Sequence, residues 1–172
     1  SPANVVKELV ENSLDAQAQS IYVETLQGGK RLIEVRDNGR GILKEDLPKV
    51  ILEGATSKIE RAEDLFAVQT LGFRGEALSS IAKVSRLSLT SRHFSQDRGY
   101  QLIVQGGKAG PLREVAHPVG TTVAVEELFF NLPVRLKFLK GAKTERKYIA
   151  ETVINYALAH PQVAFTLVQD GK

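Results

Sequence analysis

The sequence contains no cysteine, no methionine and no tryptophan, and aromatic residues make up only 6% of it. The absence of cysteine excludes disulfides and thiolate metal sites. The three histidines, His93, His117 and His160, lie far apart in the sequence, which argues against a histidine metal cluster. No apolar run approaches the roughly 20 residues that cross a bilayer, and residues 1–20 mix charged and apolar positions, unlike a secretory signal. These features predict a cytoplasmic protein without a membrane span.

The composition predicts a folded chain. The 172 residues are 42% hydrophobic and 25% charged, which is typical of globular proteins and not of disordered ones. We expect one domain over residues 1–160 and the start of a second domain at 161–172. The net charge is only +3, but residues 131–150 carry six cations against one acid. Such a segment is most often a solvated surface, and it is also typical of a contact with a phosphate backbone.

Hydrophobic periodicity predicts an α+β protein. The predicted helices are 2–16, 44–55, 75–85 and 142–160, and the predicted strands are 20–26, 31–37, 86–92, 99–107, 121–128 and one that begins at 163. Residues 56–72 have weak periodicity and are predicted to form a long irregular segment, of the kind that is often functional. The alternation of helices with antiparallel strands favours a two-layer α/β sandwich, with helices on one face of a mixed, largely antiparallel sheet.

Glu8 and Asn12 lie four residues apart beside the apolar stripe of the first predicted helix, so they share one helix face. A carboxylate in such a place can activate a water molecule by accepting its proton. A carboxamide oxygen is a suitable ligand for Mg²⁺. Taken alone, the pair is more often a solvated glutamate with a capping asparagine.

The segment DNGRGI, residues 37–42, follows a predicted strand. Asp37, at the strand end, can accept a hydrogen bond from an exocyclic amine such as that of adenine. Gly39 and Gly41 permit a close backbone approach and positive φ angles. The plain alternative is an Asx turn.

A second glycine-rich segment, TLGFRGEALSSIA, leads into a predicted helix. Gly72 and Gly75 flank Phe73 and Arg74, and the free N–H groups of a helix N-terminus suit a phosphate. The spacing matches neither the P-loop nor the dinucleotide fingerprint. An ordinary loop with a helix cap is the alternative.

Short hydroxyl-rich strings occur in GATSK, residues 54–58, and GTT, residues 120–122. Thr56, Ser57 and Lys58 can contact phosphates, and Thr121 can complete a hydrogen-bond network. Strings of this kind are common, so each is weak evidence by itself.

Taken together and in order, these motifs resemble the MutL family of DNA mismatch-repair proteins. The motifs are ELVEN, DNGRG, GFRGEAL and GTT, and the wording of PANVVKELVENSLDA and HPVGTTVAVEELFFNLPVRLKFL is similar to that family as well. MutL belongs to an ATPase superfamily, GHKL, with type II topoisomerase B subunits, ninety-kilodalton heat-shock chaperones and sensor histidine kinases. The resemblance covers nearly the whole chain, and GFRGEAL argues against a topoisomerase or a chaperone.

The resemblance implies the Bergerat (GHKL) ATPase fold and roles for individual residues. Glu8 would be the general base that activates the attacking water, and Asn12 would hold Mg²⁺. Asp37 would bind the adenine amine of ATP, with support from Thr121 through water. The other implied nucleotide contacts are Asp15, Ala16, Gly39, Gly41, Thr56, Lys58, Leu71, Gly72, Phe73, Arg74 and Gly75.

The resemblance also implies the biology of a conformational switch driven by ATP binding and slow hydrolysis. The switch would couple a mismatch-recognition protein of the MutS type to a downstream nuclease or helicase, through homodimerisation and a transducer-like second domain from residue 161. DNA would contact the basic segment, with Arg135, Lys137, Lys140 and Lys143 as candidate residues. The alternatives are a DNA-binding or scaffolding piece without ATP turnover of its own, or another ATPase of the superfamily.

Overall fold

The computed structural model describes residues 1–52 and 75–172. The helices are α1 (Pro2–Asp15), α2 (Leu47–Ile51), α4 (Gly75–Lys83), α5 (Pro133–Lys137) and α6 (Ala142–Ala159), with 3-10 turns η1 (Gln27–Gly29) and η2 (Lys44–Asp46). The strands are β1 (Ser20–Leu26), β2 (Leu32–Asp37), β3 (Arg86–Arg92), β4 (Gly99–Gln105), β5 (Lys108–Ala109), β6 (Arg113–Val115), β7 (Gly120–Glu126) and β8 (Ala164–Gln169).

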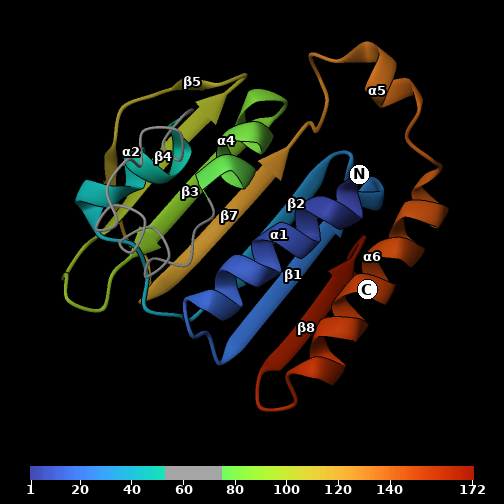
Figure 1. The fold of residues 1–172 in the computed structure, drawn as a ribbon. Helices are drawn as coiled ribbons and strands as arrows, with labels where there is room; N and C mark the ends of the chain where they lie inside the picture. Colours follow the sequence, from blue (N-terminus) through green and yellow to red (C-terminus); the bar gives the residue numbers. More distant parts are fainter. Residues whose placement is uncertain (53–74) are drawn as a thin grey trace.

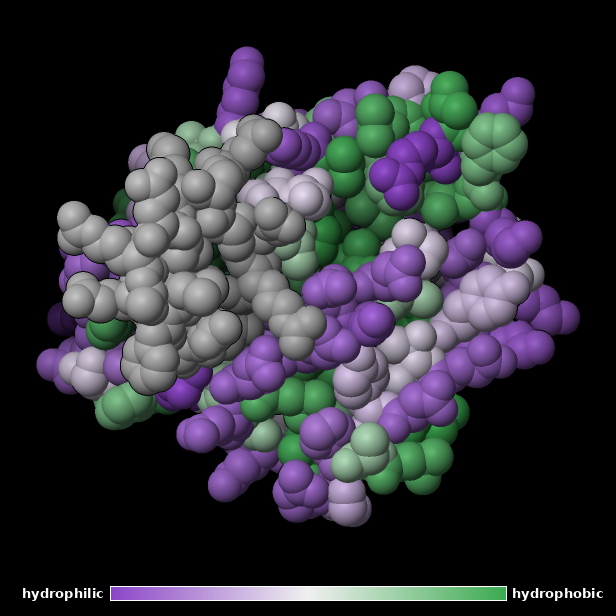
Figure 2. All heavy atoms as spheres, in the orientation of Figure 1, coloured by the Kyte–Doolittle hydropathy of each residue, from purple (hydrophilic) through white to green (hydrophobic). Residues whose placement is uncertain are grey.

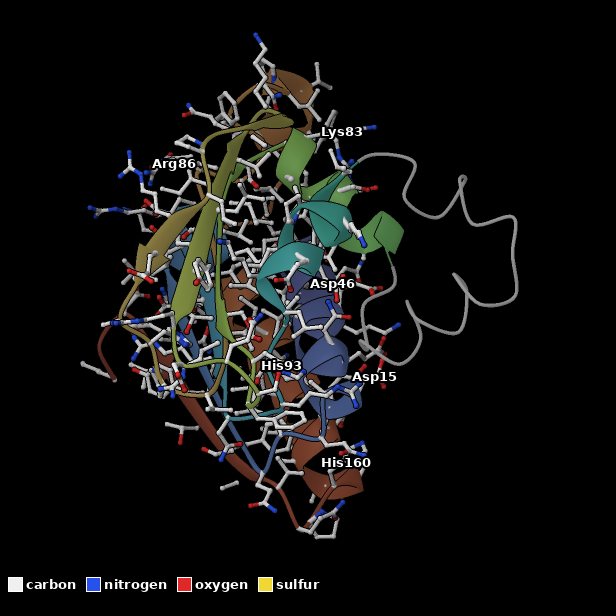
Figure 3. All side chains as sticks on the ribbon, turned by 90° about the vertical axis from the view of Figure 1, so that its left-hand side faces the viewer. Asp15, Asp46, Lys83, Arg86, His93 and His160 are labelled. Atoms are coloured by element: carbon white, nitrogen blue, oxygen red, sulfur yellow. The ribbon has the colours of Figure 1, made fainter. Side chains whose placement is uncertain are left out.

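The eight strands form one mixed sheet, which confirms the predicted α+β sandwich. The strand order is β5-β4-β3-β7-β2-β1-β8, and β6 also pairs with β4. Each of these neighbouring pairs is antiparallel except β1 with β8. Helices α1, α2 and α4 cover one face, and α6 runs beside β8 at the edge (Figure 1). Seen edge on, Asp15 and Asp46 lie on the helix side of the sheet and Arg86 on the opposite side (Figure 3).

Helix α1 forms because its ends and its buried face suit a helix. The Ser1 hydroxyl caps it by accepting from the Asn4 N–H at 3.3 Å, and Pro2 occupies the first turn. Leu9 and Val10 lie within the apolar core, and Asn12 follows them into it. The helix thus carries a polar side chain into the space between itself and the sheet.

The sheet presents rows of side chains to α1, and the rows change character toward one end. Val35 on β2 pairs with Val123 on β7, which pairs with Leu89 on β3. Two residues further along, Asp37 pairs with Thr121, which pairs with Ser91. Because alternate residues of a strand point to the same face, this polar row continues the apolar core surface. The apolar core therefore ends at this row, and its polar side chains form a candidate binding site.

Several elements differ from their predicted bounds. The predicted helix 44–55 is a 3-10 turn followed by α2, which ends at Ile51, and the predicted strand 99–107 ends at Gln105. The short elements β5, β6 and α5 are absent from the prediction because two to five residues give no readable period. Strand β8 extends the main sheet, so the predicted boundary at residue 161 does not coincide with a sheet edge, and a second domain that begins there stays a prediction. Within the part of the chain that the structure describes, no helix is both long and apolar enough to cross a membrane.

Gly120 has no room for a side chain where β7 begins. Its φ is +131°, and a Cβ there would lie 2.1 Å from the backbone oxygen of Asp37. We expect Gly120→Ala to lower the free energy of unfolding by about 3 kcal/mol, because both the backbone angle and the overlap oppose it. Urea denaturation measures this loss. The control is Gly110→Ala, where the nearest atom is 3.4 Å away; equal stability losses in the two variants would contradict the prediction.

Candidate nucleotide-binding site

Asp37 lies at one end of the polar row, beside Thr121, and is held by its neighbours. Its Oδ2 accepts from the Ser13 hydroxyl at 2.7 Å, and its Oδ1 accepts from the Gly39 N–H at 2.8 Å. These two bonds fix both carboxylate oxygens and tie the end of β2 to the end of α1. Because an ionised carboxylate has about four lone-pair positions, it keeps acceptor capacity for a further donor.

Burial raises the pKa of Asp37 above its ordinary value. The Ser13 hydroxyl, the backbone N–H groups of Gly39 and Thr121, and the positive charge that His117 can carry all act in the opposite direction. Burial outweighs them because it penalises the charged form of the carboxyl group. The state of charge of Asp37 is thus sensitive to its surroundings, which is common at binding sites.

The hydroxyl of Thr121 joins the same site. Ser91 Oγ donates to the Gly120 carbonyl at 3.0 Å, accepts from the Ile42 N–H at 2.8 Å and lies 2.8 Å from Thr121 Oγ1. Since the Ser91 hydroxyl has one hydrogen and gives it to Gly120, Thr121 is the donor of the last bond. The lone pairs of Thr121 therefore stay available to accept from a ligand or a water molecule.

The turn after β2 lies directly against the C-terminal end of α1. The Arg40 N–H donates to the Ala16 carbonyl at 3.0 Å, and a Cβ on Gly39 would lie 2.7 Å from that same oxygen. Gly41 has φ +77°, and a Cβ there would lie 2.0 Å from the Arg92 carbonyl. Glycine is therefore required at both positions for the backbone to pass. Ala16 is buried beneath the turn, whereas the side chain of Asp15 is exposed.

Asn12 is a polar residue in the core, and only 5% of it is exposed. Nδ2 is enclosed without a hydrogen-bond partner in residues 1–52 and 75–172, and Oδ1 makes no hydrogen bond there either. An enclosed amide without a partner costs about 1–3 kcal/mol. The carboxamide oxygen, which bonds to none of the described residues, is the kind of ligand that a hard cation such as Mg²⁺ prefers, so the Asn12 side chain fits that ion.

Glu8 lies one helical turn before Asn12 on α1 and is partly exposed. Its carboxylate makes no hydrogen bond or ion pair with the described residues. A carboxylate that is not engaged by the protein can accept a proton from a bound water. Glu8, Asn12 and Ser13 therefore place three polar groups on the part of α1 that leads to Asp37.

Part of the predicted site lies outside the described residues. Gly75 is the first residue of α4. The other residues of the predicted phosphate-binding stretches fall in the segment 53–74, which the structure does not describe: Thr56, Lys58, Leu71, Gly72, Phe73 and Arg74.

The basic segment lies apart from the polar row, around α5 and the start of α6. Arg135, Lys137, Lys140 and Lys143 are exposed, and no acidic residue occurs between 131 and 144. The guanidinium of Arg135 lies over the Phe129 ring, 4.5 Å from its centroid. Hydrophobic residues gather around α5 as well (Figure 2).

Sequence reasoning missed three residues that support the site. Ser13 and Ser91 bond to Asp37 and Thr121, and the side-chain oxygen of Asn38 accepts from the N–H groups of Gln19 and Ser20 at 2.8 and 2.9 Å. Ser13 directly follows Asn12, which is the only local signal for it. Ser91 has no local signal, because its role depends on the pairing of β3 with β7.

Comparison with known proteins places this geometry in a family. The family model described as histidine kinase-, DNA gyrase B- and HSP90-like ATPase matches residues 1–110. The DNA mismatch repair protein MutL of Aquifex aeolicus is 55% identical over 172 residues, and the match covers 100% of this chain and 40% of that protein. The MutL protein of Mannheimia succiniciproducens is also 55% identical, over 99% of this chain and 27% of its own length. The chain therefore spans less than half the length of these relatives.

Solved structures agree with the sequence matches. The Aquifex aeolicus MutL ATPase domain complexed with ADP superposes with a TM-score of 0.81 and 45% identity, over 99% of this chain and 60% of that one. A second structure of the same ATPase domain gives a TM-score of 0.80 over 100% of this chain and 58% of that one. The chain belongs to the histidine kinase-, DNA gyrase B- and HSP90-like ATPase family, and within it corresponds to part of the ATPase domain of MutL.

Proposed function

We propose that the chain binds ATP between α1 and the polar row of the sheet, and that it is the hydrolytic part of a mismatch-repair switch. One observation carries this proposal. Asp37, at the end of β2, is held by Gly39 and by Ser13, and Ser13 lies on the same helix as Glu8 and Asn12. The ADP complex of the similar Aquifex aeolicus domain supports it.

Asp37 recognises the adenine base in this proposal. Its carboxylate accepts a hydrogen bond from the exocyclic amine, and Thr121, directly or through water, accepts or relays a second bond. Guanine presents a carbonyl oxygen where adenine presents the amine, so the carboxylate would repel it. Gly39 leaves space beside the carboxylate for the base, since a Cβ there would lie 3.1 Å from Asp37 Oδ1. Gly41 lets the turn pass close to the Arg92 backbone.

Glu8 and Asn12 serve the phosphate end. Glu8 accepts a proton from the attacking water, and Asn12 would hold Mg²⁺, which supplies charge neutralisation at the phosphates when it is bound. The helix positions both groups on one face, so that little rearrangement is needed before reaction. Asp15 and Ala16, at the end of the same helix, would line the nucleotide.

The remaining phosphate contacts are proposed from the sequence motifs. Thr56 and Lys58 supply hydroxyl and cationic groups, and the stretch Leu71–Gly75 supplies N–H groups at the entrance of α4. Free N–H groups and the positive end of a helix dipole stabilise phosphate charge.

In the complete protein we propose that ATP binding drives homodimerisation in the cytoplasm. The dimer would couple a MutS-type mismatch-recognition protein to a downstream nuclease or helicase. Residues 161–172 would lead toward a transducer-like domain. The similarity to MutL proteins supports this assignment over another ATPase of the family.

The test of the proposed function is a comparison of ATP with GTP by calorimetric titration in the presence of Mg²⁺. We expect saturable binding of ATP, and binding of GTP weaker by at least about 10-fold, because one charge-assisted bond is worth about 1.5–3 kcal/mol. Equal affinities for the two nucleotides would contradict the adenine assignment of Asp37.

Asn12→Ala separates a metal role from a structural one. The variant should lose the gain in nucleotide affinity that Mg²⁺ gives, since the implied ligand is gone. Its urea midpoint should stay the same or rise, because the removed amide has no partner among the described residues. The control is Asn131→Ala, which makes the same chemical change where the amide donates to the Lys83 carbonyl. An Asn12→Ala variant that keeps the full Mg²⁺ dependence would refute the metal role.

A second candidate function is DNA binding through the basic segment. The observation that favours it is the exposure of four cations in a stretch with no acid between residues 131 and 144, whereas the next acid, Glu145, is buried. A variant that replaces four cations by glutamate should bind DNA more weakly: Arg135, Lys137, Lys140 and Lys143. The slope of log affinity against log salt concentration should become smaller in magnitude by up to about three to four. A control reverses four exposed cations elsewhere: Lys49, Lys108, Arg113 and Lys172. Unchanged DNA affinity in the first variant would exclude this segment as the contact.

A further inference from the structure

Thr121 lies in the middle of the polar row, with a possible acceptor for its hydroxyl hydrogen on each side. In the register of the sheet it pairs with Asp37 on β2 and with Ser91 on β3. The Cβ atoms of directly paired residues on one face lie about 4.5–5.5 Å apart, so the side chain of Thr121 can reach either neighbour. A hydroxyl group has a single hydrogen to donate, so only one of the two neighbours receives it.

The hydrogen-bond pattern around Ser91 gives this hydrogen to Ser91. Its Oγ accepts from the Ile42 N–H at 2.8 Å, donates to the Gly120 carbonyl at 3.0 Å and lies 2.8 Å from Thr121 Oγ1. A carbonyl oxygen only accepts, so Ser91 spends its own hydrogen on Gly120, and Thr121 must donate the third bond. Ser91 and Thr121 are both buried, so bulk water does not compete for these bonds.

Asp37 accepts from other groups. The Ser13 hydroxyl and the Gly39 N–H hold its two oxygens, and the backbone N–H of Thr121 also stabilises the carboxylate. Among the described residues, no hydrogen bond joins the Thr121 hydroxyl to Asp37. Since a carboxylate has about four lone-pair positions, a donor hydroxyl from Thr121 would occupy the one that remains.

We propose that Ser91 is a positioning residue that keeps one acceptor position of Asp37 open for the adenine amine, because it draws the hydroxyl hydrogen of Thr121 away from the carboxylate. This rests on the proposed role of Asp37 in adenine binding. Without Ser91, the Thr121 hydroxyl loses its acceptor, and a rotation about the Cα–Cβ bond turns it toward Asp37. It then competes with the adenine amine for the same lone pair.

The test combines two substitutions on the two sides of this hydrogen bond. Ser91→Ala removes the acceptor, and Thr121→Val keeps the shape of the threonine but removes the competing hydroxyl. ADP affinity is measured by calorimetric titration for the wild type, for each single variant and for the double variant. The control is Ser85→Ala, which removes another buried hydroxyl, one that donates to the Ile81 carbonyl at 2.7 Å.

We expect Ser91→Ala to bind ADP about 3- to 10-fold more weakly than the wild type, the effect of about one hydrogen bond. Thr121→Val alone should also weaken binding, because Thr121 supports the base in the proposed function. The double variant should nevertheless bind ADP at least about threefold more tightly than Ser91→Ala, because the competing donor is gone. The affinity of Ser85→Ala should match that of the wild type.

This rescue distinguishes the proposal from a merely structural role. If Ser91 only braces the strands and the turn at Ile42, removing a second hydroxyl cannot restore affinity. A double variant that binds ADP no more tightly than Ser91→Ala would therefore overturn the proposal. Should Ser91→Ala fail to fold, Ser91→Cys replaces it, because a thiol keeps the size and is a weaker acceptor. Its ADP affinity should also be lower than that of the wild type and should rise when Thr121→Val is added.

A readout without nucleotide separates this inference from the proposed function. A hydrogen bond to a carboxylate favours its charged form. Carbon-13 NMR of the free protein should therefore show Asp37 titrating at lower pH in Ser91→Ala than in the wild type, and close to the wild-type pH in the double variant. If Asp37 titrates alike in Ser91→Ala and the wild type, the inference fails, whereas nucleotide binding by the wild type can still stand. If the titration shifts as expected and the wild type binds no ADP, the direction of the hydroxyl holds and the proposed function fails.

Discussion

Replacing Glu8 by glutamine is expected to lower the rate of ATP hydrolysis in the complete protein by about 10²–10⁴-fold, the usual contribution of a general base. Glutamine has the same shape but cannot accept a proton from water. Nucleotide affinity should change by less than about threefold, because Glu8 is not proposed to contact the adenine, the metal ion or the phosphates. Single-turnover hydrolysis and calorimetric titration measure the two quantities separately.

The matched control for this prediction lies on the same helix. Glu11→Gln removes a carboxylate three residues away, one that accepts a hydrogen bond from the Tyr156 hydroxyl. We expect that variant to keep most of the hydrolysis rate. Hydrolysis by Glu8→Gln at the wild-type rate would rule out Glu8 as the base. An equal loss in both variants would point to a disturbed helix instead.

Asp37→Asn is expected to weaken ATP binding by about 10–150-fold, the value of one hydrogen bond to a charged group. The asparagine oxygen can still accept from Gly39, and its amide can donate to Ser13, so the polar row keeps its shape. The amide then points a donor at the adenine amine, which is also a donor. Titration with ATP and with GTP should show that the preference for ATP is lost; a variant that still prefers ATP would contradict the role.

The same variant makes a prediction about stability and pH. Because the pKa of Asp37 is higher in the folded protein than in the unfolded chain, the folded state binds the proton more tightly. The free energy of unfolding should therefore fall as the pH rises from the ordinary carboxyl range through the raised pKa of Asp37. Asp37→Asn should remove that part of the fall. A wild-type stability that rises through this range because of Asp37 would contradict the assigned direction.

Much of the fold was predictable because its elements are long and strongly patterned. The apolar stripe of α1 and the alternation in β1, β2, β3 and β7 define which faces are buried. Segments such as α5 carry no such signal, since α5 has five residues and buries none of its side chains. The parallel pairing of β8 with β1 joins strands that are far apart in the sequence, and local periodicity does not encode it.

The site was predictable where a motif is local and less so where it depends on pairing. Glu8 and Asn12 share a helix face through their spacing alone. Asp37, Thr121 and Ser91 form one row only because β2, β7 and β3 are neighbours in a particular register. Ser13 meets Asp37 across 24 residues of sequence. Sequence reasoning therefore predicted the residues of the local motifs, whose roles stay predictions, and missed Ser13 and Ser91, which bond to them.

The most direct measurement is calorimetric titration of the unmodified protein with a non-hydrolysable ATP analogue, once with Mg²⁺ and once with a chelator. A nucleotide held between α1 and the polar row, with Mg²⁺ at Asn12, predicts one site that binds more tightly when Mg²⁺ is present. The absence of saturable binding under both conditions would contradict the proposed nucleotide site.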